Sequence, residues 1–203
     1  MAGFSIPIQP EQNSSGAVSF LERHVIEEAT QTFYAWTPVQ INGTDGGVQA
    51  WDGTTVTNGI AGFASENASN LATTGVGAPQ GFTPVLGPGS TIGSYAANPN
   101  QPLAVITPSL VPINDGGISF VVAASFMVFV GAVGTSGQAA IATTNQMVGT
   151  KAGLTIDTNG YWYVDTSKSN TVEIVGLDPR DAVGQVGGRV WFVVQTAAAQ
   201  ILG

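Results

Sequence analysis

Few side chains in this sequence are suited to catalysis. The chain has 203 residues, with one histidine, His24, and no cysteine. Thiol chemistry, disulfides and cysteine metal sites are therefore excluded, and a second histidine for a zinc site is lacking. His24 lies beside Glu22 and Arg23, a setting more typical of a surface or structural residue than of a catalyst. We therefore expect no enzymatic activity, no cofactor and no functional metal site.

The acidic residues suggest two further kinds of chemistry, and neither pattern is complete. The segment DTNG at 157–160, followed by Asp165, is the nearest match to a calcium loop. It lacks the spacing of an EF-hand and the glutamate at the twelfth position. We interpret it as an Asx turn before a strand. A carboxylate pair for glycoside hydrolysis could be drawn from residues such as Glu66 and Glu173, but the sequence does not place them in space.

Two glycine-rich segments are interpreted as hairpin loops. Residues 131–137 and 184–188 lack the Lys-Ser/Thr pair of a phosphate-binding loop and its strand-to-helix context. Just before the second segment, Asp178 and Asp181 flank Arg180 closely enough to form a local ion pair. Such a pair contributes about 0–1 kcal/mol at a surface, so we expect it to shape the loop more than to stabilise the protein.

The tryptophans are the remaining candidates for a binding role. Each of the four lies in a predicted strand, and they are Trp36, Trp51, Trp162 and Trp191. Packing in a core or an interface explains them, while a platform for carbohydrate is the alternative for any that is exposed.

Composition favours strands and turns and argues against several partners. Charged residues make up 9% of the chain, whereas glycine occurs 27 times and proline 11 times. The chain is thus poor in the lysine and glutamate that favour exposed helices. The net charge of −8 argues against nucleic acid and against anionic membranes. The absence of cysteine fits synthesis in a reducing cytoplasm, and the first residues lack the features of a signal peptide.

Hydrophobic patterning predicts the strands. Runs rich in valine, isoleucine and aromatic residues, bounded by Gly, Asn, Asp and Pro, predict strands at 38–41, 48–51, 161–164, 172–175 and 189–194. The apolar run 118–133 is shorter than the about 20 residues of a spanning helix, and it predicts one long strand or two bent ones. Residues 17–36 fit either a short helix ending near Thr30 or a strand, and we favour the strand.

Two stretches also resemble a known family. The first is WTPVQINGTDGGVQAWDGTTVTNGIAGFASENA, and the second contains YWYVDTS and VEIVGLDPRDAVGQVGGRVWFVV. Both resemble the cement, or head decoration, proteins of tailed bacteriophages, over about a third of the chain. The resemblance implies an all-β fold of jelly-roll or related barrel or sandwich type. It also implies a virion protein that is made in the host cytoplasm, binds the outside of the capsid and braces the major capsid protein.

Within that interpretation, the chain divides into an extended N-terminal arm, 1–16, and a single β domain, 17–203, with a Gly/Pro/Asn-rich excursion at about 67–102. We expect a homo-oligomer whose arm and excursion contact the shell, so that deletion of residues 1–15 leaves a folded protein that binds shells weakly. The apolar residues expected to dock are Phe4, Ile6, Ile8, Phe82, Val85, Leu86 and Tyr95.

Two other functions remain open. A phage fibre or receptor-binding protein would share the composition, although a fibre shaft should show repeats and none is visible. A β-sandwich carbohydrate-active enzyme would need an export signal and a placed acid/base pair.

Overall fold

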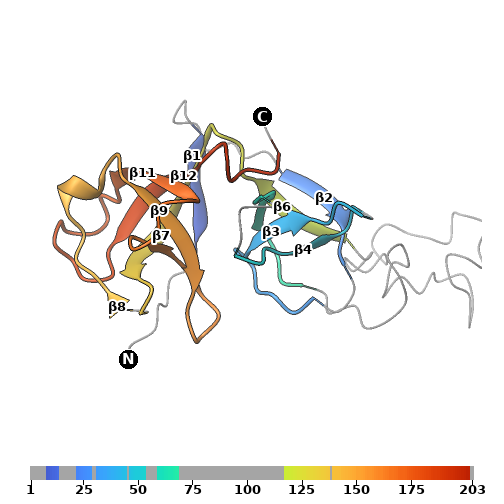
Figure 1. Cartoon of the computed structure of the whole chain (residues 1–203), viewed down its shortest axis with the longest axis horizontal. Helices are drawn as coiled ribbons and strands as arrows, with labels where there is room; N and C mark the ends of the chain where they lie inside the picture. The colour runs from blue at the N-terminus through green and yellow to red at the C-terminus, as the bar shows by residue number, and fades with distance from the viewer. Residues whose placement is uncertain are drawn as a thin grey trace, which may run out of the picture.

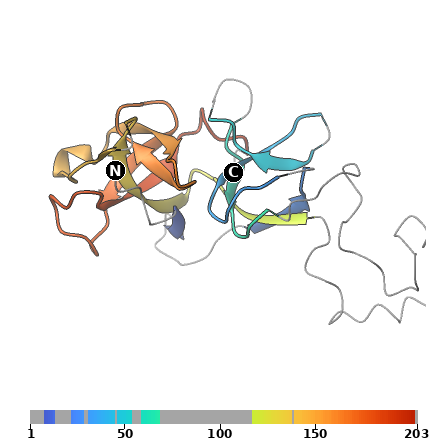
Figure 2. The same ribbon diagram turned by 90° about the horizontal axis from the view of Figure 1, so that it is seen from below.

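The protein is all-β. The computed structural model describes residues 8–13, 22–28, 31–44, 46–53, 59–68, 117–137 and 139–201. Within these ranges the elements are strands joined by turns, with a short 3-10 turn at Asn145–Met147 and no α-helix. The predicted all-β class is confirmed, in its barrel form. A barrel and a second sheet lie side by side in both views (Figures 1 and 2).

The barrel is closed by a ring of hydrogen-bonded strands. Its order is β7 (Met127–Thr135), β10 (Trp162–Asp165), β9 (Lys151–Ile156), β11 (Val172–Leu177) and β12 (Arg189–Val194), and β12 pairs with β7 again. The β10–β7 pair is parallel and the other pairs in the ring are antiparallel. A closed ring leaves no edge among these strands for uncontrolled pairing.

Strand β7 is buried along almost its whole length and pairs with several strands. Its first half pairs with β1 (Gln9–Asn13) as well as with β12, and its end pairs with β8 (Ala139–Ala140) as well as with β10. All but its last residue are buried. This explains why its sequence is a continuous apolar run rather than an alternation.

The second sheet curls on itself. Its order is β2 (Glu22–Ile26), β6 (Gly117–Val122), β5 (Gly62–Ala64), β3 (Pro38–Ile41) and β4 (Val48–Ala50). A bridge between Glu27 and Val48 joins the end of β2 to β4, and the Glu28 N–H donates to the Val48 carbonyl at 2.8 Å. The two outer strands therefore meet.

The barrel and the second sheet share one hydrophobic core. The ring of Phe63, from β5, lies 4.4 Å from that of Phe129 in β7 and 6.2 Å from that of Phe192 in β12. After β12 the chain returns to the second sheet. There the Gln200 side chain donates to the Ile41 carbonyl at 2.6 Å and accepts from the Ile41 N–H at 2.7 Å.

Most strand predictions are confirmed, and one tryptophan is a correction. The run 118–133 forms two strands, β6 and β7, with a turn at Ser125 and Phe126 between them. The strand within 17–36 is β2. Trp36, however, lies in a turn with φ of 68° rather than in a strand. Its N–H donates to the Ala64 carbonyl at 2.6 Å, a contact from outside its own segment that holds this conformation.

Candidate binding groove between the two sheets

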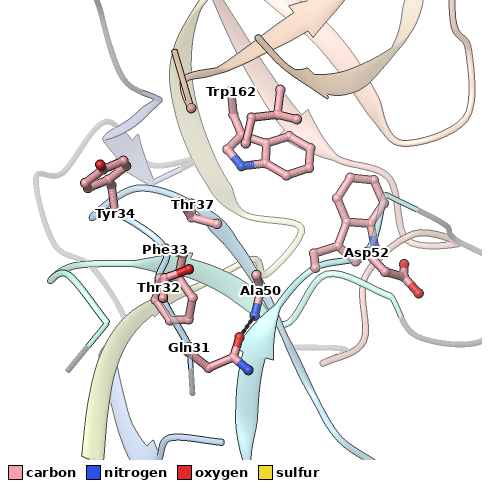
Figure 3. Close-up of a pocket in the computed structure, with 11 residues that line it drawn as sticks. Gln31, Thr32, Phe33, Tyr34, Thr37, Ala50, Asp52 and Trp162 are labelled. Atoms are coloured by element: carbon pink, nitrogen blue, oxygen red, sulfur yellow. Dashed lines mark hydrogen bonds between the residues drawn. The ribbon is translucent and has the colours of Figure 1, made fainter. Parts of the chain in front are cut away.

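A groove lies where the barrel meets the second sheet. It has a volume of about 480 Å³ and is lined by aromatic side chains and uncharged polar groups (Figure 3). The aromatic side chains are those of Phe33, Tyr34, Trp51 and Trp162. We call this site the junction groove. Its volume falls within the range of about 300–1,000 Å³ that is usual for small-molecule sites.

The barrel wall of the groove comes from the β9–β10 hairpin. Side chains alternate along β10, so Trp162 and Val164 join the shared core while Tyr163 packs in a separate cluster with Ala132. The hydroxyl of Tyr163 donates to the Thr135 carbonyl at 2.8 Å. The alternation therefore turns the indole of Trp162 toward the second sheet.

The turn of this hairpin is the predicted Asx turn, which is confirmed. The Asp157 Oδ1 accepts hydrogen bonds from the N–H groups of Asn159 at 2.9 Å and Tyr161 at 2.8 Å. Gly160 adopts φ of 87°, which favours glycine. A Cβ at Gly160 would lie 3.4 Å from the ring of Tyr34, so the turn packs directly against the opposite wall.

The other wall comes from residues 31–37 and from the end of β4. The Gln31 Oε1 accepts from the Ala50 N–H at 3.1 Å, which ties this segment to β4 (Figure 3). Trp51 follows β4 directly, and its ring lies 5.6 Å from that of Trp162 at 39°. Tyr34 is 61% exposed at the mouth. The groove therefore has an enclosed aromatic corner and an open aromatic rim.

One polar atom at this corner has no partner within the described residues. The Nε1 of Trp162 is buried and donates to no acceptor there, and Trp162 as a whole is 8% exposed. Figure 3 shows this nitrogen on the side of the ring that faces Tyr34 and Thr37. An unsatisfied buried donor costs about 1–3 kcal/mol. The corner thus contains a buried indole donor that is unpaired among the described residues.

The lining carries no positive charge. Among the described residues around the groove, Asp52 is the charged side chain, and no lysine, arginine or histidine is present. There is also no cysteine or serine nucleophile with a base beside it. The arrangement suits binding of an uncharged ligand.

An ion-pair cluster at the barrel joins β1 to the loop between β11 and β12. Arg180 Nη2 lies 2.7 Å from Glu11 Oε2 and 2.8 Å from Asp178 Oδ2. Arg189 Nη2 lies 2.7 Å from Asp181 Oδ1, and Arg189 Nε lies 3.3 Å from Asp178 Oδ2. The predicted Asp178–Arg180 pair is therefore present within a larger network, which sequence proximity did not indicate.

This network lowers the carboxyl pKa values. Burial of Asp178 opposes its ionisation, but hydrogen bonds from Arg180 and the charges of both arginines outweigh burial and lower its pKa. The side-chain hydrogen bond from Arg189 is the main cause of the lowered pKa of Asp181. Hydrogen bonds and ion pairs inside a packed loop explain these shifts, so we assign the cluster a structural role.

Asp165 is a second buried carboxylate with a structural explanation. Burial raises its pKa, but hydrogen bonds from hydroxyl groups outweigh this, and the pKa is lowered. The donors include Ser167 Oγ at 2.5 Å, Thr155 Oγ1 at 2.8 Å and Ser136 Oγ at 3.1 Å. Asp165 therefore ties together β9, β10 and the turn after β7.

The loop at 178–188, which we call the valine loop, presents apolar side chains to solvent. Val183 is 61% exposed and Val186 is 66% exposed. Two backbone hydrogen bonds to Thr143 hold the loop in place. The Thr143 N–H donates to the Gln185 carbonyl at 3.1 Å, and the Gly184 N–H donates to the Thr143 carbonyl at 2.9 Å. The glycines of this segment predict a hairpin loop, whereas the exposure of the valines between them is seen only in the structure.

Of the residues that we expected to contact a partner, the structure describes one, Ile8. Ile8 is fully buried in the core of its own chain, because β1 pairs with β7 and Gly131 leaves room for its side chain. Its predicted partner contact is therefore wrong. The others lie outside the described residues, namely Phe4, Ile6, Phe82, Val85, Leu86 and Tyr95.

The candidate acids for glycoside hydrolysis lie in different sheets. Glu66 follows β5 and accepts from the Ser119 N–H at 2.6 Å, whereas Glu173 lies in β11 of the barrel. In the described ranges, no group of three or more His, Cys, Asp or Glu side chains could hold a metal ion. A helix long and apolar enough to cross a membrane is likewise lacking in that part of the chain.

No protein family, curated protein or solved structure matches this chain.

Proposed function

We propose that this chain is a structural virion protein, a cement or decoration protein that binds the outer surface of a phage head. In this role it stabilises the shell by bridging subunits of the major capsid protein. The observation that carries the proposal is the valine loop, which holds Val183 and Val186 in exposed positions. The family-like motifs at 36–68 and 161–194 support the same role.

The valine loop is built to bind without reorganising. Ion pairs of Asp178 and Asp181 with Arg180 and Arg189 hold its ends, and backbone bonds to Thr143 hold its middle. A loop that is ordered before binding loses little conformational entropy on binding. Burying a valine-sized side chain that was exposed contributes about 1.5–3 kcal/mol. Two such side chains on one rigid loop suit a protein surface as partner.

The valine loop also lies where a large partner can reach it. Both views show it at the end of the barrel away from the second sheet (Figures 1 and 2). A protein that binds the assembled shell, and not the free subunits, stabilises the shell by mass action.

Co-sedimentation with heads of the phage that encodes this chain tests the proposal. Val183→Asp combined with Val186→Asp should weaken binding by at least about tenfold, or 1.4 kcal/mol, because the charges would be buried against the shell. Tyr34→Asp is the matched control, since Tyr34 is also 61% exposed but lies in the junction groove. It should bind as the wild type does.

Circular dichroism should show that both variants are folded. Undiminished head binding by the double valine variant would rule out the valine loop as the contact. A wild-type chain that does not co-sediment with heads at all would refute the cement function itself.

A further inference from the structure

We propose that the junction groove is a binding site for a neutral saccharide, an uncharged hexose unit of a glycan, with Trp162 as hydrogen-bond donor. The capsid proposal does not depend on this site, since the groove and the valine loop share no lining residue. Either proposal can therefore fail alone.

The aromatic walls suit the apolar face of a sugar ring. Trp51 and Trp162 meet at 39° with their centroids 5.6 Å apart, which forms an inner corner. Tyr34 forms the outer rim, where it is 61% exposed and packs against Gly160. A pyranose presents a face of C–H groups that packs on such rings, while its hydroxyl groups point to the sides.

The polar groups suit the hydroxyl edge of a sugar. Trp162 Nε1 is a buried donor with no acceptor among the described residues, and it is directed toward Tyr34 and Thr37 (Figure 3). The lining also includes the carboxylate of Asp52 and the hydroxyl of Thr32. Because a sugar hydroxyl both donates and accepts, a hydroxyl at the edge of the ring can accept from the indole donor of Trp162.

Charge and hydrogen bonding exclude other ligands. With no cationic side chain in the lining and a net charge of −8 for the chain, a phosphate, sulfate or uronate would find no opposite charge to pair with and would be repelled by the net charge. A proline-rich peptide would also pack on the aromatic rings. Such a peptide runs along an extended groove, whereas the junction groove is compact, with a volume of about 480 Å³, so a single hexose unit fits better.

Binding is tested by calorimetry on the full chain, and by saturation-transfer NMR, with neutral glucan, galactan and mannan oligosaccharides as probes and a proline-rich peptide as the competing probe. At least one neutral oligosaccharide should bind with a Kd in about the millimolar range or tighter, while oligogalacturonate, the acidic counterpart of galactan, should not. Trp162→Phe, which removes the N–H and keeps an aromatic ring, should weaken binding by about tenfold or more. Tyr34→Ala should weaken it by a similar factor.

Trp191→Phe is the matched control. The Nε1 of Trp191 is also buried and unpartnered within the described residues, but Trp191 lies in β12 and does not line the groove. The same chemical change there should leave the Kd unchanged. If none of the neutral probes binds, if Trp162→Phe binds as the wild type does, or if only a proline-rich peptide binds, the saccharide assignment is wrong.

Discussion

Trp51 and Trp162 are separated by most of the chain, yet their rings lie 5.6 Å apart, one after β4 of the second sheet and the other in β10 of the barrel. The two indoles meet only when the two sheets pack together. Trp51 is 3% exposed and belongs to the shared core. This pair therefore links the stability of the sheet junction to the shape of the groove beside it.

Trp51→Ala should lower the free energy of unfolding by about 3–5 kcal/mol, because it leaves a cavity between the sheets. Urea denaturation followed by circular dichroism measures the loss. Tyr34→Ala, at the exposed rim of the same groove, should cost much less. A loss of under about 1 kcal/mol for Trp51→Ala would contradict a tight junction at this point.

Ile8→Ala should lower the free energy of unfolding by about 2–5 kcal/mol, the range for a buried aliphatic truncation. Ile8 is fully buried, and a Cβ at Gly131 would lie 3.1 Å from its side chain. Replacement of the exposed neighbour Gln9 by alanine is the control and should change little. Thermal or urea unfolding distinguishes the two.

The same geometry corrects the expectation for deletion of residues 1–15. That deletion removes β1 from β7 and removes the Glu11 partner of Arg180. The shortened protein should therefore be less stable than the full chain, in contrast to the intact fold expected of a free arm. A truncated protein with the full unfolding free energy would show that β1 contributes nothing.

Asp181→Asn should lower stability by about 1–3 kcal/mol near neutral pH, because Arg189 loses a charged partner that accepts two hydrogen bonds from its guanidinium. The pKa of Asp181 is lowered in the folded state. The carboxylate therefore stabilises the fold above its unfolded pKa of about 3.9, and this contribution is lost as pH falls through the lower folded pKa.

Unfolding free energies of wild type and Asp181→Asn, measured by urea denaturation from about pH 7 to pH 2, check this dependence. The difference between the two proteins should stay constant down to about pH 4 and then shrink. Gln9→Ala, at an exposed uncharged residue outside the valine loop, controls for general acid sensitivity. A difference that grows as pH falls would contradict the assigned direction.

The local features were readable from the sequence. The strands at 38–41 and 189–194 follow from β-branched and aromatic residues between turn residues, and both appear as predicted. The Asx turn at Asp157 involves bonds to residues two and four positions away, so its own sequence determines it. The shortage of lysine and glutamate, together with the strand and turn pattern, likewise indicated the all-β class.

Only the tertiary structure decided which of these strands meet. Arg180 binds Glu11, which is 169 positions away, and Gln200 binds Ile41 across 159 positions. Such pairs depend on the register of β1 on β7 and on the closure of β12 onto β7. Neither feature can be predicted from the local pattern of residues. Ile8 looked like a free apolar side chain for the same reason. The junction groove belongs to this class too, since its walls are separate segments that become neighbours only when the barrel and the second sheet bury a common core.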